Sequence, residues 1–245
     1  MTQAKHAMPD TLTAKSAQTY LRGCADAAIA KHSQGFFKTG QGQYGQGDKF
    51  LGIRVPVVRA VAKRYAGLSI AEVTTVLKSA WHEERQFALL VMVNRYAQAD
   101  PKEQARLYKL YLANTRYINN WDLVDCSAHK IVGPYLSDKS RKPLYQLARS
   151  KDLWEKRIAI MSTFHFIKNA DFDDTLEIAE ILLTDEHDLI HKAVGWMLRE
   201  IGKLNQRAEE SFLQAHYKQM PRTMLRYAIE RFPEKQRQAY LKGSV

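Results

Sequence analysis

The sequence predicts an all-α protein built as an α-solenoid, and two observations support this prediction. Strand patterns are scarce after Thr13, whereas helical periodicity and helix-start signals recur along the chain. From residue 82 onward, a more apolar helix alternates with a shorter or more polar one, at intervals of about 35 residues. Two helices per interval are typical of arrays that stack helix pairs. The alternative is a globular all-α bundle in which the regular spacing arises by chance.

Local start signals support the individual helices. Ser69 and Glu72 form a capping-box pattern, and Asp100 followed by Pro101 is typical of a helix start. The more apolar helices of the repeats start near residues 82, 120, 152, 187 and 221. The expected helices cover 13–32, 56–66, 70–79, 82–98, 101–114, 120–133, 141–149, 152–168, 171–183, 187–203, 205–217, 221–231 and 233–242.

The composition excludes several classes of protein. The 245 residues include 37 Lys or Arg and 26 Asp or Glu, so the net charge is +11 at pH 7 and the expected partner is a polyanion. The longest apolar run, Phe87 to Val93, is far shorter than the roughly 20 residues that span a membrane. No secretory signal is visible, and two cysteines, Cys24 and Cys126, exclude a disulfide framework. We therefore expect a cytoplasmic protein.

The domain organisation follows from the same patterns. A polar N-terminus is expected to be flexible over residues 1–12. A single helical-repeat domain is expected over 13–245, because no long linker interrupts the series of helices. No amphipathic helix is left over for a partner subunit, so we expect a monomer.

A tryptophan lies on the polar side of the helix expected over 187–203. Trp196 falls about 140° from the centre of the apolar stripe, beside the cations Lys192, Arg199 and Lys203. A tryptophan among cations can stack on a sugar or base while the cations hold phosphates. The alternative is a tryptophan that packs against the next repeat.

Two charged residues lie on apolar helix faces. Arg157 is near the middle of the apolar arc of the helix over 152–168, where an arginine snorkels, pairs with a buried acid or lines a polar cleft. Trp121 and Asp125 lie one turn apart on the helix over 120–133. A carboxylate on such a face is costly unless it is paired.

These charged residues occupy equivalent places in successive repeats. Asp125, Arg157, Lys192 and Arg226 each lie about five residues into an apolar helix. Equivalent positions of stacked repeats line up along one surface, usually the concave one. We therefore expect a concave basic groove in which one acid is followed by three cations, with the two tryptophans on its walls. A solvated charged face is the alternative.

Two apparent motifs are not expected to bind a ligand. The segment Gly40-Gln-Gly42-Gln-Tyr-Gly45 has the spacing of a dinucleotide fingerprint, but it follows no strand and starts no helix. His187 and His191 have the one-turn spacing of a zinc-ligand pair, but no third ligand is evident downstream. We therefore expect no metal and no cofactor.

Five sequence segments carry a specific resemblance to a known family. They are Tyr44-Gly-Gln-Gly-Asp-Lys-Phe-Leu-Gly-Ile-Arg-Val-Pro56, His82-Glu-Glu-Arg85, Asn119-Asn-Trp121-Asp-Leu-Val-Asp125, Trp154-Glu-Lys-Arg157 and Lys192-Ala-Val-Gly-Trp196-Met-Leu-Arg-Glu200. Together they resemble the AlkD-type DNA alkylation-repair proteins, from about residue 18 to the end. The resemblance implies a right-handed solenoid of HEAT-like two-helix repeats and a DNA glycosylase of base excision repair that removes N3- and N7-alkylated purines. It also implies that Asp125 is the catalytic aspartate, Trp121 and Trp196 the site tryptophans, and Arg157 the groove arginine.

The residues suit the chemistry of such a substrate. A cationic alkylpurine leaves the sugar as a neutral base, so it requires no general acid. One carboxylate can stabilise the developing oxocarbenium sugar and orient a water molecule. We expect Asp125 to be ionised, because nearby cations favour its charged form. The expected phosphate-binding residues are Arg157, Lys192, Arg199, Lys203 and Arg226.

The expected partner is therefore double-stranded DNA with alkylated purines, bound by a cytoplasmic monomer that joins the nucleoid when it holds DNA. Two other functions stay open. One is a catalytically silent solenoid that recognises an unusual DNA or RNA backbone shape. The other is a protein-binding scaffold whose basic groove takes an acidic peptide. Salt-sensitive binding to random duplex DNA would separate the scaffold from the other two, and release of methylated base would separate the enzyme from the silent binder.

Overall fold

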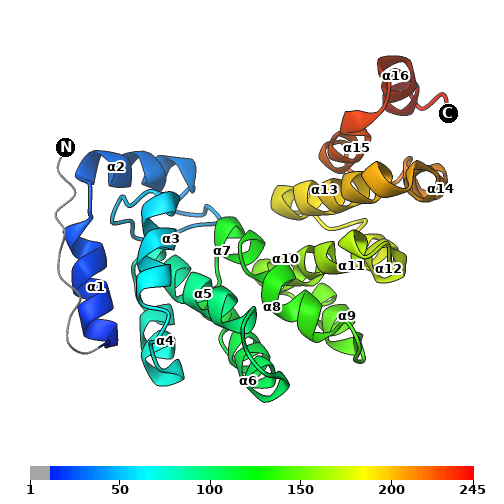
Figure 1. Cartoon of the computed structure of the whole chain (residues 1–245). Helices are drawn as coiled ribbons and strands as arrows, with labels where there is room; N and C mark the ends of the chain where they lie inside the picture. Colours follow the sequence, from blue (N-terminus) through cyan, green and yellow to red (C-terminus); the bar gives the residue numbers. More distant parts are fainter. Residues whose placement is uncertain (1–11) are drawn as a thin grey trace. The chain divides into compact units, whose positions relative to one another are not determined.

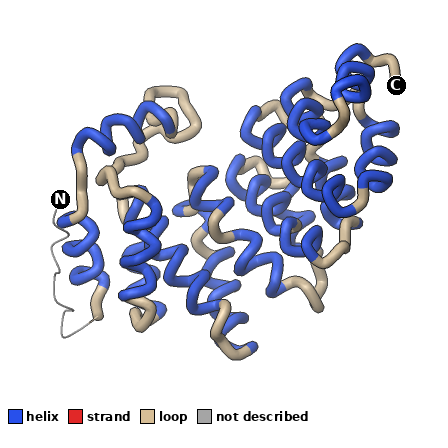
Figure 2. The backbone as a smooth tube through the Cα atoms, turned by 45° about the horizontal axis from the view of Figure 1, so that its top comes forward, coloured by secondary structure: helices blue, strands red, loops and turns tan. Residues whose placement is uncertain are grey.

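The computed structural model describes residues 12–245, and their regular structure is helical throughout (Figures 1 and 2). The all-α prediction is confirmed for this part of the chain. The flexible N-terminus predicted over 1–12 lies, apart from Leu12, outside the described residues. In the described region, no helix is both long and apolar enough to cross a membrane. The chain divides into two compact units, residues 1–100 and 101–245, and the single domain expected over 13–245 stays a prediction.

The first unit is organised around α5, a helix that is buried on nearly all sides. It packs against three other helices of the unit, whereas α2 has no buried residue. The core side chains include Leu21, Leu77 and Phe87. The helices described in this unit are α1 (Ala14–Gly23), α2 (Ala27–Phe36), α3 (Val55–Arg64), α4 (Ile70–Leu77) and α5 (His82–Tyr96).

The single helix predicted over 13–32 was wrong, because the structure contains two helices there. The helix α1 ends at Gly23, and α2 begins after Asp26. The carboxylate of Asp26 accepts the backbone N–H of Ile29 at 2.9 Å, which caps the second helix. A side-chain cap of this kind satisfies an N–H group that a continuous helix would bond to its own backbone.

The second unit places each more apolar helix next to the following one. The helix α10 contacts α7, α8, α9 and α13, and α13 in turn contacts α14 and α15. A stacked array of helix pairs requires neighbours in this order, and the solenoid itself stays a prediction. The elements are α6 (Pro101–Leu112), η1 (Thr115–Tyr117), α7 (Trp121–Asp125), α8 (Ala128–Tyr135), α9 (Lys142–Ala148), α10 (Leu153–Ser162), α11 (Phe164–Lys168), α12 (Asp173–Ile181), α13 (Asp188–Leu204), α14 (Gln206–His216), α15 (Arg222–Ala228), η2 (Ile229–Arg231) and α16 (Glu234–Lys242).

One helix contact in the second unit depends on a glycine. A Cβ atom at Gly195 would lie 2.4 Å from the carbonyl oxygen of Met224 and 2.5 Å from the Cβ of Tyr227. Helices α13 and α15 therefore approach each other more closely than any larger residue allows. This contact fixes one face of α13 and leaves the adjacent Trp196 on another.

The single helices predicted over 120–133 and 152–168 were also wrong, because each of these segments forms two helices. The first divides into α7 and α8 near Ser127, whose hydroxyl donates to the Leu123 carbonyl at 2.5 Å. The second divides into α10 and α11 at Thr163, whose hydroxyl donates to the Ile160 carbonyl at 2.7 Å. Such side-chain bonds to the preceding turn compete with helical hydrogen bonds. The two short 3₁₀ segments were not predicted.

Candidate active site

An ion pair between Asp125 and Arg157 forms the centre of the candidate site. Arg157 donates from Nε to Oδ1 of Asp125 at 2.8 Å and from Nη2 to Oδ2 at 2.7 Å. A third donor, Nη1, bonds the carbonyl oxygen of Leu189 at 2.6 Å. These bonds join the end of α7, the second turn of α10 and the first turn of α13. The side chain of Arg157 is 5% exposed and that of Asp125 is 16% exposed, so the carboxylate is the more accessible partner.

Burial sets the electrostatics of this pair. It raises the pKa of the Asp125 carboxyl above its ordinary value, and the nearby Asp122 acts in the same direction. The charge and hydrogen bonds of Arg157 oppose this rise. Because arginine stays protonated, the two-point geometry is that of a carboxylate and a guanidinium. The paired Asp125 is therefore charged, and it loses that charge at a higher pH than a solvated aspartate.

Trp121 lies one helical turn before Asp125, as the sequence predicts. It is the first residue of α7, and its side chain is half-buried. The side-chain oxygen of the buried Asn120 accepts the backbone N–H of Trp121 at 2.9 Å. This cap fixes the start of a helix only five residues long, and with it the placement of both the indole and the carboxylate.

Trp196 reaches the same region through a row of aromatic rings. Its indole meets the ring of Phe164 with centroids 6.1 Å apart and an interplanar angle of 47°. Phe164 in turn meets the imidazole of His129 at 5.4 Å, and the ammonium of Lys168 lies 4.3 Å from the Phe164 centroid. His129 follows Asp125 by four residues. The rings of His129, Phe164 and Trp196 therefore form a row that begins one helical turn after Asp125 and ends on α13.

His129 is the histidine closest to Asp125 in sequence, and it is uncharged at neutral pH. Burial, followed by the charges of Lys130 and Lys168, lowers its pKa to about 4. Its Nδ1 atom is buried and has no hydrogen-bond partner among residues 12–245. A neutral imidazole of this kind is a poor proton donor at pH 7. The site therefore offers a carboxylate without an imidazolium beside it.

Two of the predicted phosphate-binding cations remain open to solvent. The ammonium of Lys192 lies 2.7 Å from the carboxylate of Asp188, and both side chains are more than one-third exposed. Arg226 is exposed, and within the described residues its side chain makes no ion pair. A surface pair such as Lys192–Asp188 contributes about 0–1 kcal/mol, so a phosphate can replace its carboxylate.

Two further predicted cations, Arg199 and Lys203, pair with acids, and the fifth, Arg157, is the buried partner of Asp125. Arg199 bonds Glu230, and its side chain is 17% exposed. Lys203 lies 2.6 Å from Oε1 of Glu200. Each would exchange an intramolecular partner for a phosphate, as Lys192 would. Lys203 is as exposed as Lys192, so Arg199, at 17% exposed, is the least available of these three cations.

Sequence reasoning missed three groups at the site: the carbonyl of Leu189, the ring of Phe164 and the carboxylate of Glu200. A backbone carbonyl leaves no mark in a sequence, and Phe164 lies beyond a helix break that the periodicity did not show. Glu200 was detectable, because it follows Trp196 by one helical turn and accepts its indole N–H at 2.9 Å.

The two histidines with zinc-ligand spacing, which were not expected to bind a metal, bond the backbone instead. The ring of His187 accepts the backbone N–H of Leu189 at 3.1 Å and so caps α13. The ring of His191 bonds the carbonyl of Asp185. In the part of the chain that is described, no group of three or more metal-ligating side chains comes together.

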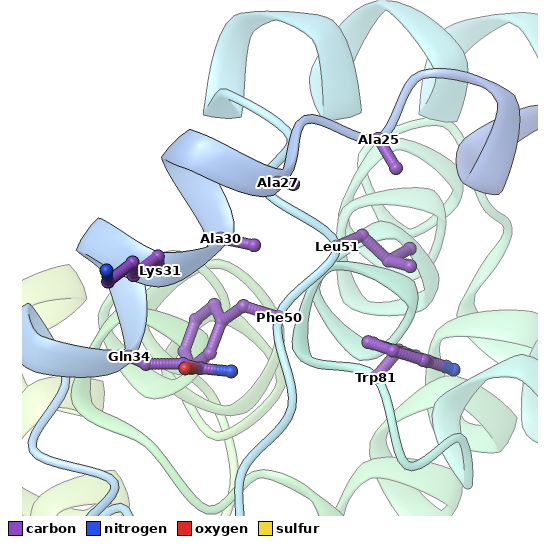
Figure 3. Close-up of a pocket in the computed structure, with 8 residues that line it drawn as sticks. All are labelled: Ala25, Ala27, Ala30, Lys31, Gln34, Phe50, Leu51 and Trp81. Atoms are coloured by element: carbon purple, nitrogen blue, oxygen red, sulfur yellow. The ribbon is translucent and has the colours of Figure 1, made fainter.

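The first unit contains a separate open pocket of about 490 Å³ (Figure 3). It lies between α2 and the extended segment that carries Phe50 and Leu51, with Trp81 at its edge. The loop with the predicted fingerprint spacing lies between α2 and α3. None of the predicted site residues lines this pocket, so the candidate site belongs to the second unit alone.

One comparison with known proteins identifies a family, and another finds a similar fold. A family described as "DNA alkylation repair enzyme" matches residues 17–232 of the chain. The chain is also similar to a solved structure described as "Predicted DNA alkylation repair enzyme from Enterococcus faecalis". That match has a TM-score of 0.66 and 16% identity, and it covers 86% of this chain and 97% of the other, which is a likeness of fold. No curated protein matches the sequence significantly.

Proposed function

The chain belongs to the DNA alkylation repair enzyme family, and on this premise we propose that it is a DNA glycosylase of base excision repair. Its substrates are N3- and N7-alkylated purines in duplex DNA. The observation that supports the proposal most strongly is the pair of Asp125 and Arg157. A buried arginine holds a carboxylate by two hydrogen bonds and leaves it 16% exposed. A carboxylate that served only to neutralise Arg157 would gain nothing from that exposure.

The proposed reaction uses this carboxylate twice. The bond between C1′ of the sugar and the purine nitrogen breaks, and its electron pair neutralises the positive charge of the alkylated base. The sugar becomes an oxocarbenium cation, which the negative charge of Asp125 stabilises. Water then attacks C1′, and Asp125 accepts the proton that this water releases. Arg157 fixes the orientation of the carboxylate and opposes its protonation.

The absence of a general acid agrees with a cationic substrate. A neutral base leaves the sugar readily only when a group protonates it, whereas an alkylpurine cation already carries the charge. His129 would be the nearest donor, and its pKa of about 4 leaves it neutral at pH 7. The proposed site therefore suits a substrate that brings its own positive charge.

The remaining predicted residues bind the nucleic acid in this proposal. Trp121 and Trp196 offer aromatic surface to the sugar or the cationic base. The duplex lies along a basic groove of HEAT-like repeats, where exposed cations such as Lys192 and Arg226 hold phosphates without reading sequence. Arg157 serves mainly to position Asp125, because it is almost completely buried.

The experiment that tests the function is chromatography of free bases released from duplexes that each carry one lesion. The protein should release 3-methyladenine and 7-methylguanine, and it should leave uracil, hypoxanthine and 8-oxoguanine in place. Bulkier alkyl groups should also be accepted, because a base that leaves by itself does not need a tight pocket. Efficient release of a neutral base would show that a general acid acts, with His129 the first residue to examine. Salt-sensitive duplex binding without any base release would favour the silent nucleic-acid binder instead.

A further inference from the structure

The indole of Trp196 has a specific anionic partner. Its Nε1–H donates to Oε1 of Glu200 at 2.9 Å, one turn later on α13. The Glu200 side chain is 13% exposed, and the ammonium of Lys203 lies 2.6 Å from the same oxygen. Arg199 approaches this oxygen to 3.8 Å. The carboxylate is therefore held from two sides by cations while it accepts the single N–H that an indole can donate.

This bond restricts the ring in two ways. Phe164 packs against the indole, and Glu200 fixes its N–H edge. Hydrogen bonds to ionised acceptors are shorter and stronger than neutral ones, so the indole should keep one orientation relative to α13. A ring held at two points loses little further freedom when a ligand binds against its face.

The bond also changes the charge distribution of the ring. The indole nitrogen shares its lone pair with the π system, so a negative acceptor at the N–H pushes electron density onto the ring. The face of the indole becomes more negative, and cations are attracted to that face. A neutral acceptor at the same place would produce a smaller effect.

We propose that Glu200 is a positioning residue that orients Trp196 and makes its π face more negative, so that this face attracts the cationic alkylated nucleotide more strongly. The inference rests on the proposed glycosylase function. It assigns to Glu200 a part in the preference for positively charged lesions. Glu200 itself touches neither the sugar nor the base.

The first test is nuclear magnetic resonance of the indole N–H groups. The sequence contains four tryptophans, so few indole signals are expected, and Trp196→Phe identifies the one from Trp196. That signal should lie downfield in the wild type and move upfield in Glu200→Gln, with a larger change in Glu200→Ala. Glu180→Gln is the matched control, since it removes the same charge from an exposed position of α12. An unmoved Trp196 signal in Glu200→Gln and Glu200→Ala would overturn the inference whatever the activity.

The second test is a double-mutant cycle on the release of 7-methylguanine from duplex DNA under single-turnover conditions. The Glu200→Gln variant should release the base about 3- to 10-fold more slowly, on the scale of one cation–π interaction. It should not bind undamaged duplex more weakly, because Lys203 loses the acid that competes with phosphate for it. The same change on the Trp196→Phe background should have almost no effect, because Phe has no N–H for Glu200 to accept. Equal losses on both backgrounds would show that Glu200 acts without Trp196. A wild-type protein that releases no base would overturn the glycosylase function itself, whereas a wild-type rate in Glu200→Gln would overturn only the role of Glu200.

Discussion

Two buried charge clusters, one in each unit, differ in the number of side chains that bond the carboxylate and in how far the carboxylate is exposed. At the start of α5 in the first unit, Asp48 bonds His82 and Arg85 at 2.8 Å each, and its side chain is only 3% exposed. In the second unit, Asp125 bonds Arg157 by two hydrogen bonds and remains 16% exposed. The pKa values follow this difference. Burial favours a higher pKa for Asp48, but its partners outweigh burial and lower it, whereas the pKa of Asp125 is raised.

The neighbours of Asp48 show what the first cluster does. Glu83 accepts the backbone N–H groups of Leu51, Gly52 and Ile53 at 2.7–3.1 Å. These bonds fasten the segment before α3 to α5, which is a structural role for Glu83. Buried charge of this kind also occurs where a carboxylate only anchors the backbone, so it does not by itself mark a functional site. A carboxylate that pairs with one arginine and remains partly exposed, as Asp125 does, is the better candidate for a catalytic residue.

Glu209 on α14 extends the comparison to a third carboxyl. Its side chain is buried, and in the described region its Oε1 atom has no hydrogen-bond partner. Burial, with the charge of Glu210, raises its pKa from 4.5 to about 8, while Arg199 opposes the rise. The three carboxyls therefore differ in their partners: Asp48 bonds two side chains, Asp125 bonds one and is more exposed, and Glu209 has a buried oxygen without a hydrogen bond among residues 12–245. Each case predicts a different response to mutation.

A large loss of stability is expected when Asp48 is replaced, because, as at Asp125, its partner arginine is buried. The Asp48→Asn variant should lose about 3–5 kcal/mol of unfolding free energy, because it leaves Arg85 buried without its counter-charge. Base release per folded molecule should stay near the wild-type value. Urea denaturation together with single-turnover release measures both quantities. A stable Asp48→Asn protein with greatly reduced release would show that the first cluster takes part in the chemistry.

Removal of the partner of Asp125 should alter the pH dependence of activity. Arg157→Ala takes away the charge that opposes burial, so the pKa of Asp125 should rise further. The acid limb of the release rate should move to higher pH, and the rate at a fixed pH on that limb should fall about 10-fold for each unit of the movement. Rates measured from pH 5 to 9 test this prediction. An unchanged acid limb would mean that Arg157 does not control the charge of Asp125, and a salt slope reduced by about one would assign it to a phosphate.

Glu209 should make the protein less stable as the pH rises. Its folded pKa of about 8 lies above the ordinary 4.5, so the folded state binds the proton more tightly and stability falls between these two values. The Glu209→Gln variant cannot ionise, so it should flatten this fall and be about 1–3 kcal/mol more stable than wild type at pH 8. Thermal or urea unfolding at pH 5 and pH 8 measures the effect. The exposed Glu180→Gln variant is the control, and an identical pH dependence in wild type and Glu209→Gln would contradict the argument.

The smallest effect is expected at the exposed cation Arg226. Arg226→Gln should weaken duplex binding modestly for all sequences and reduce the slope of log affinity against log salt by about one. Fluorescence anisotropy at several salt concentrations measures the slope. Lys235→Gln, on the exposed side of α16, removes the same charge and should leave the slope unchanged. Equal effects of the two substitutions would mean that only net charge matters.

The sequence predicted much of the helical fold, because helix starts have local causes. Pro101 begins α6 and Ser69 caps α4, and both signals are visible in a few adjacent residues. The breaks near Ser127 and Thr163 were not predicted. Both depend on hydroxyl hydrogen bonds to the preceding turn. The free energy of such a bond differs little from that of the helical hydrogen bond with which it competes. Apolar periodicity continues across such breaks and therefore hides them.

The sequence picked out the residues of the candidate site, but it did not predict which of them contact one another. The sequence marks both Asp125 and Arg157 as charges on apolar faces, which are costly unless paired. It does not reveal that they pair with each other, because the periodicity of one helix says nothing about the neighbouring side chains. The bond from Trp196 to Glu200 also depends on side-chain rotamers that spacing alone leaves open.

The most direct test of the account is single-turnover release of 7-methylguanine by the Asp125→Asn variant. Asparagine keeps the shape of the side chain and removes its charge, so release should fall by about 100-fold or more. Duplex binding should persist or tighten, since a charge that repels phosphates is gone. Asp173→Asn removes the same charge at an exposed position in the first turn of α12, and it should behave as wild type. Release at the wild-type rate by a folded Asp125→Asn protein would contradict the central role given to this carboxylate.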